Sequence, residues 1–171
     1  MSLECCAKLL IRHNLVNKMQ LRIDSDQQMQ QLGAQLAIAS GGRGRVYLYG
    51  ELGTGKTTLV RGLIRALGHV GAVKSPTFTL VEPYQIGDKN IYHFDLYRLS
   101  DPEELEYMGL RDYFSSDSLC LVEWPSKGGR LLPPADITLK LHHNGTSRDI
   151  NIEAGTEAGE SMLKLLKSSD L

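Results

Sequence analysis

The chain has 171 residues, of which 42% are hydrophobic and 23% are charged, and its formal net charge is -1. This length and balance fit one folded domain and exclude the compositions of disordered or fibrous chains. The near-neutral charge also argues against a protein that binds nucleic acid through an extensive positive surface of its own.

Cysteine usage and hydropathy indicate the compartment. Cys5, Cys6 and Cys120 lack the paired spacing that would suggest disulfides or a zinc ribbon. The sequence has no run of 18 apolar residues, and charged residues interrupt its N-terminal stretch. We therefore predict a cytoplasmic protein with no membrane segment, in which residues 1–18 are an extension outside the fold and residues 19–171 form a single domain.

The first half of the chain predicts a helix, a strand and a second helix. A capping box that begins at Ser25 and the apolar stripe after it predict a helix over 25–41. A short β-branched and aromatic run predicts a buried strand over 46–49. A second apolar stripe predicts a helix over 57–67, which a glycine ends.

The second half of the chain predicts mostly strands. Ser100 and Glu103 have the spacing of a second capping box. Alternating apolar residues and turn signals predict two hairpins, the second of them near the C-terminus. In chain order we expect strands over 77–84 and 91–94, a helix over 100–108, strands over 119–122, 137–141 and 150–152, and a closing helix over 161–166.

Residues 50–57 match the Walker A pattern of glycine, four residues, glycine, lysine and threonine. Glycines allow successive backbone N–H groups to face an anion, and the helix that follows points its positive end at the same phosphates. Lys56 would neutralise the outer phosphates and Thr57 would offer a hydroxyl to magnesium. An ordinary glycine-rich turn is the alternative, which the flanking strand and helix disfavour. The candidate nucleotide-binding residues are Gly50, Glu51, Leu52, Gly53, Thr54, Gly55, Lys56, Thr57 and Thr58.

Two carboxylates follow apolar strands, as the Walker B acid does in P-loop proteins. Asp95 and Glu123 each come directly after such a run. At the edge of a sheet, acids of this kind can hold magnesium or orient the attacking water. Alternatively, each acid caps a loop or pairs with a nearby cation, Arg98 or Lys127.

The segment 74–79 combines hydroxyl side chains with a proline, a composition that fits a loop that senses a γ-phosphate and, taken alone, also fits a turn. The histidines have no metal-ligand spacing, and His93 fits strand packing. The chain also lacks the Asn-Lys-x-Asp segment that confers guanine specificity. We therefore expect ATP to be the nucleotide.

Four segments in this order resemble the motifs of the TsaE (YjeE-like) ATPase family: residues 50–58, 75–84, 93–99 and 122–125. The resemblance extends over about residues 25–152. It implies a P-loop NTPase-like α/β fold, in which helices flank a mixed parallel and antiparallel central sheet and a β-hairpin lies near the C-terminus. The glycine-rich crossover and the two predicted hairpins are consistent with that fold.

The resemblance also implies a function. TsaE proteins act in bacterial formation of threonylcarbamoyladenosine, at the adenosine next to the anticodon of tRNAs that read codons beginning with A. They work with TsaD, which performs the transfer, and with TsaB, and their ATP hydrolysis supports turnover of that complex. We accordingly expect TsaD and TsaB as partners and tRNA as an indirect partner through the complex.

The family motifs imply roles for single residues. Five residues of the Walker A segment would bind ATP: Gly53, Thr54, Gly55, Lys56 and Thr57. Thr57 and Glu123 would hold Mg²⁺, Asp95 would be needed for hydrolysis, and Thr77 would be the switch residue. Arg148 falls where the family often has an arginine, and we assign it no role.

Two other functions fit parts of the sequence. A small-molecule kinase would share the length and the Walker A segment, but such kinases usually carry an arginine-rich lid. The segment after Glu123 offers only Lys127 and Arg130. An ATP-dependent binding module without significant turnover is the second alternative, although Asp95 and Glu123 argue for at least slow hydrolysis.

Overall fold

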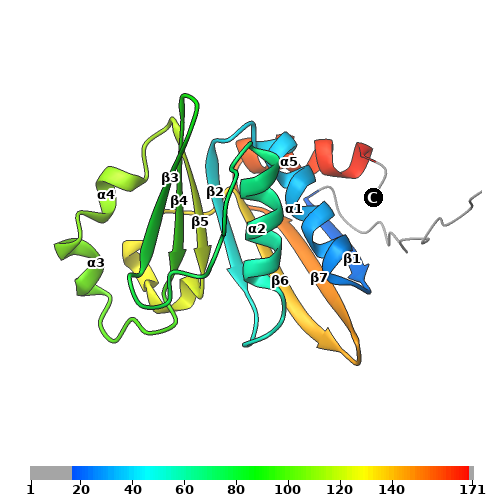
Figure 1. Ribbon diagram of the computed structural model, residues 1–171, viewed down its shortest axis with the longest axis horizontal. Coiled ribbons are helices and arrows are strands. Elements are labelled where there is room, and N and C mark those ends of the chain that lie inside the picture. The colour runs from blue at the N-terminus through cyan, green and yellow to red at the C-terminus, as the bar shows by residue number, and fades with distance from the viewer. Residues whose placement is uncertain (1–16, 170–171) are drawn as a thin grey trace, which may run out of the picture.

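The computed structural model describes residues 17–169, and its centre is one seven-stranded sheet (Figure 1). The predicted extension, residues 1–18, lies outside the described residues except for its last two. The strands are β1 (Lys18–Ile23), β2 (Gly44–Tyr49), β3 (Val81–Ile86), β4 (Lys89–Asp95), β5 (Ser118–Glu123), β6 (Ile137–Asn144) and β7 (Ser147–Ala154).

The sheet has the strand order β1-β7-β6-β2-β5-β4-β3. The four central strands, β6, β2, β5 and β4, run parallel, whereas β1, β7 and β3 pair antiparallel at the two sides. Parallel strands place their carboxyl ends at one edge of the sheet, where open α/β sheets bind ligands. The predicted α/β fold with a mixed sheet is therefore confirmed.

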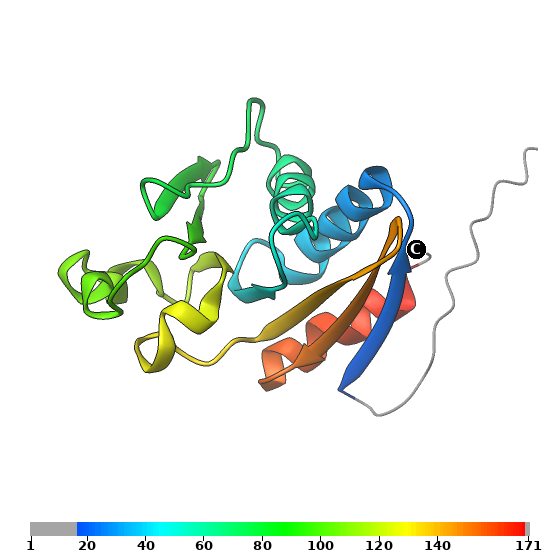
Figure 2. The same ribbon diagram turned by 90° about the horizontal axis from the view of Figure 1, so that it is seen from below.

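The helices are α1 (Asp26–Ser40), α2 (Lys56–Ala66), α3 (Glu103–Tyr107), α4 (Leu110–Tyr113) and α5 (Glu157–Ser168), and two short 3-10 turns, η1 (Pro125–Lys127) and η2 (Gly129–Leu131), follow β5. Figure 2 shows α1 and α2 lying together over the sheet. The buried side chains of α1, α2 and α5 share one apolar cluster with those of β1, β2, β6 and β7. A second cluster joins β4 and β5 to α3 and α4.

Both predicted N-terminal helices form at the predicted places. Ser25 Oγ accepts a hydrogen bond from the Gln28 N–H at 3.2 Å, so it caps α1 as its spacing predicts. The C-terminal helix is longer than predicted, because Thr156 caps α5 by accepting from the Gly159 N–H at 3.1 Å. No helix within residues 17–169 is long and apolar enough to cross a membrane.

Three local predictions were wrong or incomplete. Strand β1, which pairs with β7 along its whole length, was not predicted. The predicted strand over 77–84 begins later, at Val81, because the Leu80 N–H bonds the Pro76 carbonyl at 2.8 Å in a turn and Leu80 has a φ of 65°. The second capping box is shifted by one residue: Asp101 Oδ1 accepts from the Glu103 N–H at 2.9 Å, and Glu104 accepts from the Asp101 N–H at 3.0 Å.

Candidate nucleotide-binding site

The loop between β2 and α2 carries the Walker A segment. Two glycines give it its shape. At Gly50, an added Cβ would lie 2.7 Å from the Leu141 carbonyl oxygen, and at Gly55 the φ of 100° disfavours any side chain. Helix α2 begins directly after Gly55 without a side-chain cap. Its first N–H groups and the positive end of its dipole are therefore available to an anion.

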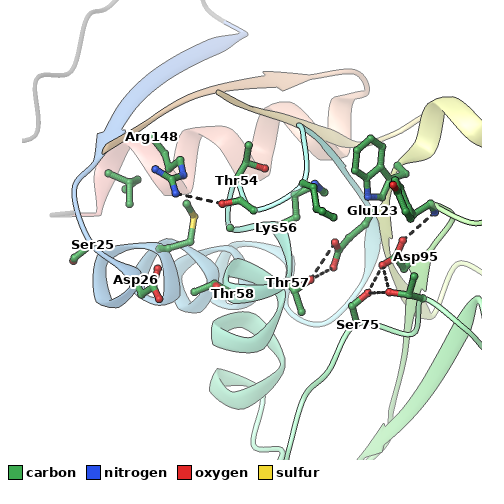
Figure 3. A pocket seen from close by; sticks show the side chains of 18 of the residues that line it. Ser25, Asp26, Thr54, Lys56, Thr57, Thr58, Ser75, Asp95, Glu123 and Arg148 are labelled. Atoms are coloured by element: carbon green, nitrogen blue, oxygen red, sulfur yellow. Dashed lines mark hydrogen bonds between the residues drawn. The ribbon is translucent and has the colours of Figure 1, made fainter. Parts of the chain in front are cut away.

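The loop forms one wall of a pocket of about 780 Å³ at the carboxyl edge of the sheet (Figure 3). A volume of this size fits a small-molecule ligand. The pocket brings together ten of the predicted site residues: Leu52, Gly53, Thr54, Gly55, Lys56, Thr57, Thr58, Thr77, Asp95 and Glu123. Gly50 and Glu51 line a neighbouring hollow behind the loop instead.

Lys56 lies folded against its own loop. Its side chain donates hydrogen bonds to the Gly50 and Glu51 carbonyls at 2.7 and 2.8 Å, and its ammonium nitrogen lies 4.4 Å from the ring centroid of Trp124. Burial lowers the pKa of Lys56, while the charges of Glu123 and Asp95 act in the opposite direction. The ammonium is thus held by neutral acceptors, which an anionic phosphate could replace.

Thr57 and Glu123 contact each other directly. Thr57 Oγ1 donates to the two carboxylate oxygens of Glu123 at 2.8 and 3.2 Å, and Glu123 is buried. Strand register explains the placement, because Asp95 and Glu123 are paired residues at the ends of the parallel strands β4 and β5. The predicted magnesium ligands therefore lie together where α2 begins.

Asp95 binds the loop that precedes β3. Its Oδ2 accepts hydrogen bonds from Ser75 Oγ and, at 3.0 Å, from Thr77 Oγ1. Its Oδ1 accepts from the Tyr97 N–H at 3.0 Å, so Asp95 also caps a turn, as one alternative foresaw. Within residues 17–169, neither Asp95 nor Glu123 forms an ion pair with Arg98 or Lys127. The Arg98 guanidinium lies over the exposed Phe78 ring instead.

Several residues that line the pocket or contact its lining were given no role in the site by the sequence. Trp124 follows Glu123 and covers Lys56, and only its place in the segment 122–125 drew attention to it. Arg148 on β7 donates to the Gly53 carbonyl at 3.3 Å across the pocket. His93 was assigned to packing and is indeed buried, but its Nε2 also lies 2.8 Å from Glu123 Oε1. These contacts depend on distant strands, which the local sequence does not reveal.

The donor set suits magnesium that arrives with a nucleotide. Within the described part of the chain, no group of three or more histidine, cysteine or acidic side chains could hold a metal ion by itself. Magnesium prefers oxygen ligands and commonly takes only one or two from the protein, with phosphates and water completing its shell. The Thr57 hydroxyl and the Glu123 carboxylate fit that role.

The parallel centre of the sheet, the strand, loop and helix around Lys56, and the two strand-end acids together define a P-loop NTPase-like α/β protein. A family model described as threonylcarbamoyl adenosine biosynthesis protein TsaE matches residues 23–150. The chain belongs to the TsaE family.

Individual relatives agree. The chain is 57% identical over 118 residues to the tRNA threonylcarbamoyladenosine biosynthesis protein TsaE of Haemophilus influenzae, covering 69% of this chain and 75% of that protein. It is 36% identical over 124 residues to the protein of that name from Bacillus subtilis, covering 72% and 77%. The crystal structure of Bacillus subtilis YdiB matches 91% of this chain and 97% of that chain with a TM-score of 0.74 and 28% identity.

Proposed function

We propose that this protein binds and hydrolyses ATP with magnesium, and that the ATP cycle supports threonylcarbamoyladenosine modification of the adenosine next to the anticodon in tRNAs that read codons beginning with A. One observation carries the chemical part: Lys56, Thr57, Asp95 and Glu123 meet in one pocket at the start of α2. Membership of the TsaE family carries the pathway part.

The phosphates would bind at the Walker A loop. The uncapped start of α2 presents its first backbone N–H groups and the positive end of its dipole, and Lys56 supplies the mobile charge. Lys56 would exchange its bonds to the neutral Gly50 and Glu51 carbonyls for bonds to anionic phosphate oxygens, in which both partners are charged.

Thr57 and Glu123 would hold the magnesium ion with their oxygens, the hard ligands that it prefers. When bound, magnesium neutralises charge on the phosphates that are being separated. Asp95 would orient the attacking water. Its bonds to Ser75 and Thr77 connect this acid to the loop over residues 74–79.

The Thr77 loop would then be the switch. A γ-phosphate that draws away a hydroxyl of the loop would change both its conformation and the exposure of Phe78, which is 82% exposed. We propose that TsaD and TsaB recognise this surface in its ATP-bound form and that hydrolysis ends the contact. tRNA would be reached through these partners, in keeping with the net charge of -1.

The two alternatives differ from this proposal in their products. A small-molecule kinase would transfer the phosphoryl group to an acceptor other than water, for which a cationic lid is usual. A binding module would bind ATP without releasing phosphate. Within residues 17–169, Arg98 lies over Phe78 and Arg148 against the P-loop backbone, so the described rim offers two single arginines and no cluster.

Nucleoside mass spectrometry tests the pathway. Depletion of the protein should remove threonylcarbamoyladenosine from cellular tRNA, and expression of the parent, but not of Lys56→Ala, should restore it. Lys164→Ala, at an exposed lysine of α5, is the matched control and should restore the modification fully. An unchanged level of the modified nucleoside after depletion would reject the pathway assignment and leave the ATPase proposal standing.

A further inference from the structure

The imidazole of His93 on β4 is fully buried beneath the site and, among the described residues, forms one hydrogen bond, to Glu123. Its Nε2 lies 2.8 Å from Glu123 Oε1. Its Nδ1 is also buried and has no hydrogen-bond partner among the described residues. An ionised carboxylate can only accept, so the bond requires a hydrogen on Nε2. A hydrogen on Nδ1 instead would leave a buried donor unpaired, which is the costlier arrangement. The hydrogen-bond network thus assigns the Nε2–H tautomer.

Packing alone does not explain an imidazole at this place. An apolar side chain of similar size would fill the same volume without an unpaired buried nitrogen, whose desolvation costs free energy. What an apolar side chain could not do is donate to Glu123. The bond to Glu123 is therefore the feature that distinguishes His93 from its apolar neighbours on β4, Ile91 and Phe94.

The strand register makes this bond a rigid restraint. His93 is paired with Leu121 and Asp95 with Glu123, so His93 and Glu123 lie on adjacent parallel strands, offset by two residues. Side chains two residues apart on a strand share a face, and diagonal neighbours on such a face are within reach of long side chains. His93 and Thr57 both bond Oε1 of Glu123, each at 2.8 Å. His93 does so from the sheet and Thr57 from α2.

We propose that His93 is a positioning residue for the magnesium site, one that holds the Glu123 carboxylate beside the Thr57 hydroxyl. The inference rests on the proposed function, in which Thr57 and Glu123 are the ligands. Carboxylates that bind metal ions are commonly oriented by a second hydrogen bond, and loss of such a partner typically lowers metal affinity about 10–100-fold. Without His93, Glu123 would be free to adopt other rotamers, and its carboxylate would less often lie beside the Thr57 hydroxyl.

The test is a magnesium titration of binding, measured with a fluorescent, non-hydrolysable ATP analogue, with and without EDTA. His93→Leu should raise the magnesium concentration for half-maximal binding about tenfold or more, and should leave the metal-free affinity within about twofold. His93→Gln, whose amide nitrogen can reach the place of Nε2, should restore most of the parental value, whereas the shorter His93→Asn should not. Ile91→Val, a change at a buried residue of the same strand, should lower stability without moving the titration.

Two further outcomes separate the possible failures. Melting temperatures show which variants fold, and if His93→Leu does not, the comparison of His93→Gln with His93→Asn carries the test. If His93→Leu, or both polar variants, require the same magnesium concentration as the parent while Glu123→Gln requires a different one, the role of His93 alone is overturned. A parental requirement in Glu123→Gln as well would overturn both this inference and the proposed magnesium role of Glu123.

Discussion

Buried carboxylates lie at both edges of the parallel sheet, in opposite environments. Asp136 precedes β6 at the amino edge, where it accepts hydrogen bonds from the Arg45 backbone N–H and guanidinium at 2.8 to 3.1 Å. Thr156 Oγ1 donates to it at 2.6 Å. This cluster joins β2, β6 and the start of α5. Hydrogen bonds between two charged groups are stronger than those between neutral groups, so this cluster stabilises the amino edge of the sheet.

The carboxyl edge has no equivalent. Among the described residues, Asp95 and Glu123 accept only from hydroxyls, a backbone N–H and the His93 imidazole, and neither pairs with a lysine or an arginine. Lys56 is nearby but donates to carbonyls. The difference teaches that an acid paired with a cation stabilises the fold, whereas an acid bonded only to uncharged groups can exchange them for a ligand. Variants at the two edges should therefore affect different properties.

The largest expected effect is on activity at the carboxyl edge. Lys56→Ala should lower ATP hydrolysis about 100-fold or more, because the outer phosphates lose a charge that a methyl cannot replace. Its melting temperature should stay close to the parental value, since within residues 17–169 the ammonium contacts two backbone carbonyls and the Trp124 ring and forms no ion pair. Phosphate release and thermal unfolding would be measured on the same samples. Hydrolysis at the parental rate would remove Lys56 from the phosphate site.

The next effect is on stability at the amino edge. Asp136→Asn should lower the free energy of unfolding by about 2–3 kcal/mol, because the Arg45 guanidinium loses its charged partner. Affinity for ATP should not change, since Asp136 lies at the other edge of the sheet. Denaturant unfolding and nucleotide titration measure the two quantities. The control is Asp117→Asn, which affects an exposed ion pair with Arg43 and should cost less than about 1 kcal/mol. Equal losses in both variants would contradict the comparison.

At acid pH, the free energies of unfolding of the parent and of Asp136→Asn should become more similar. Burial raises the pKa of Asp136, but the hydrogen bonds from Arg45 and Thr156 outweigh it and hold the pKa below the ordinary value of 3.8. A carboxylate whose pKa is lowered by folding contributes stability above the ordinary value and loses it as the pH falls through the folded-state value. Unfolding curves from pH 6 down to about pH 3 should show the difference shrinking below pH 3.8. A constant difference would mean that Asp136 acts without its charge.

The smallest effects concern the helix caps at the two edges. Ser25→Ala at the start of α1 should cost about 1 kcal/mol, the usual value for a lost N-cap. Thr156→Ala should cost about 2 kcal/mol, because it also removes the hydrogen bond to Asp136. Chemical denaturation resolves the two values. If Ser25→Ala lowers the free energy of unfolding more than Thr156→Ala does, the amino edge does not contribute more to stability than the carboxyl edge.

The sequence predicted the parts of the site that follow from local order. The Walker A segment and the acids after two apolar runs were sufficient, because parallel strands bring their ends to one edge. Strand β1 was not predicted, although Met19, Leu21 and Ile23 lie inside the predicted domain and alternate with polar residues. Its partner β7 begins more than 120 residues later, and such pairing leaves no local signal.

The cluster of Arg45, Asp136 and Thr156 at the amino edge could not be predicted from the sequence. Asp136 and Arg45 are separated by 91 positions, and nothing near either residue indicates the other. The same holds for His93, whose burial was predicted but whose bond to Glu123 depends on how β4 and β5 align. Turn geometry accounts for the errors in two predicted element boundaries. The turn that places Leu80 at positive φ delays β3, and the cap of α3 lies one residue beyond its predicted place.

The most direct test of the central claim is phosphate release from saturating ATP and magnesium by the parent, Asp95→Asn and Glu123→Gln, with ATP affinity measured alongside. Both substitutions keep the shape of the side chain and remove its charge. The account predicts measurable release by the parent, a loss of about tenfold or more in each variant, and ATP affinity that changes much less than the rate. Equal rates in all three proteins would contradict it and make Asp95 and Glu123 structural acids.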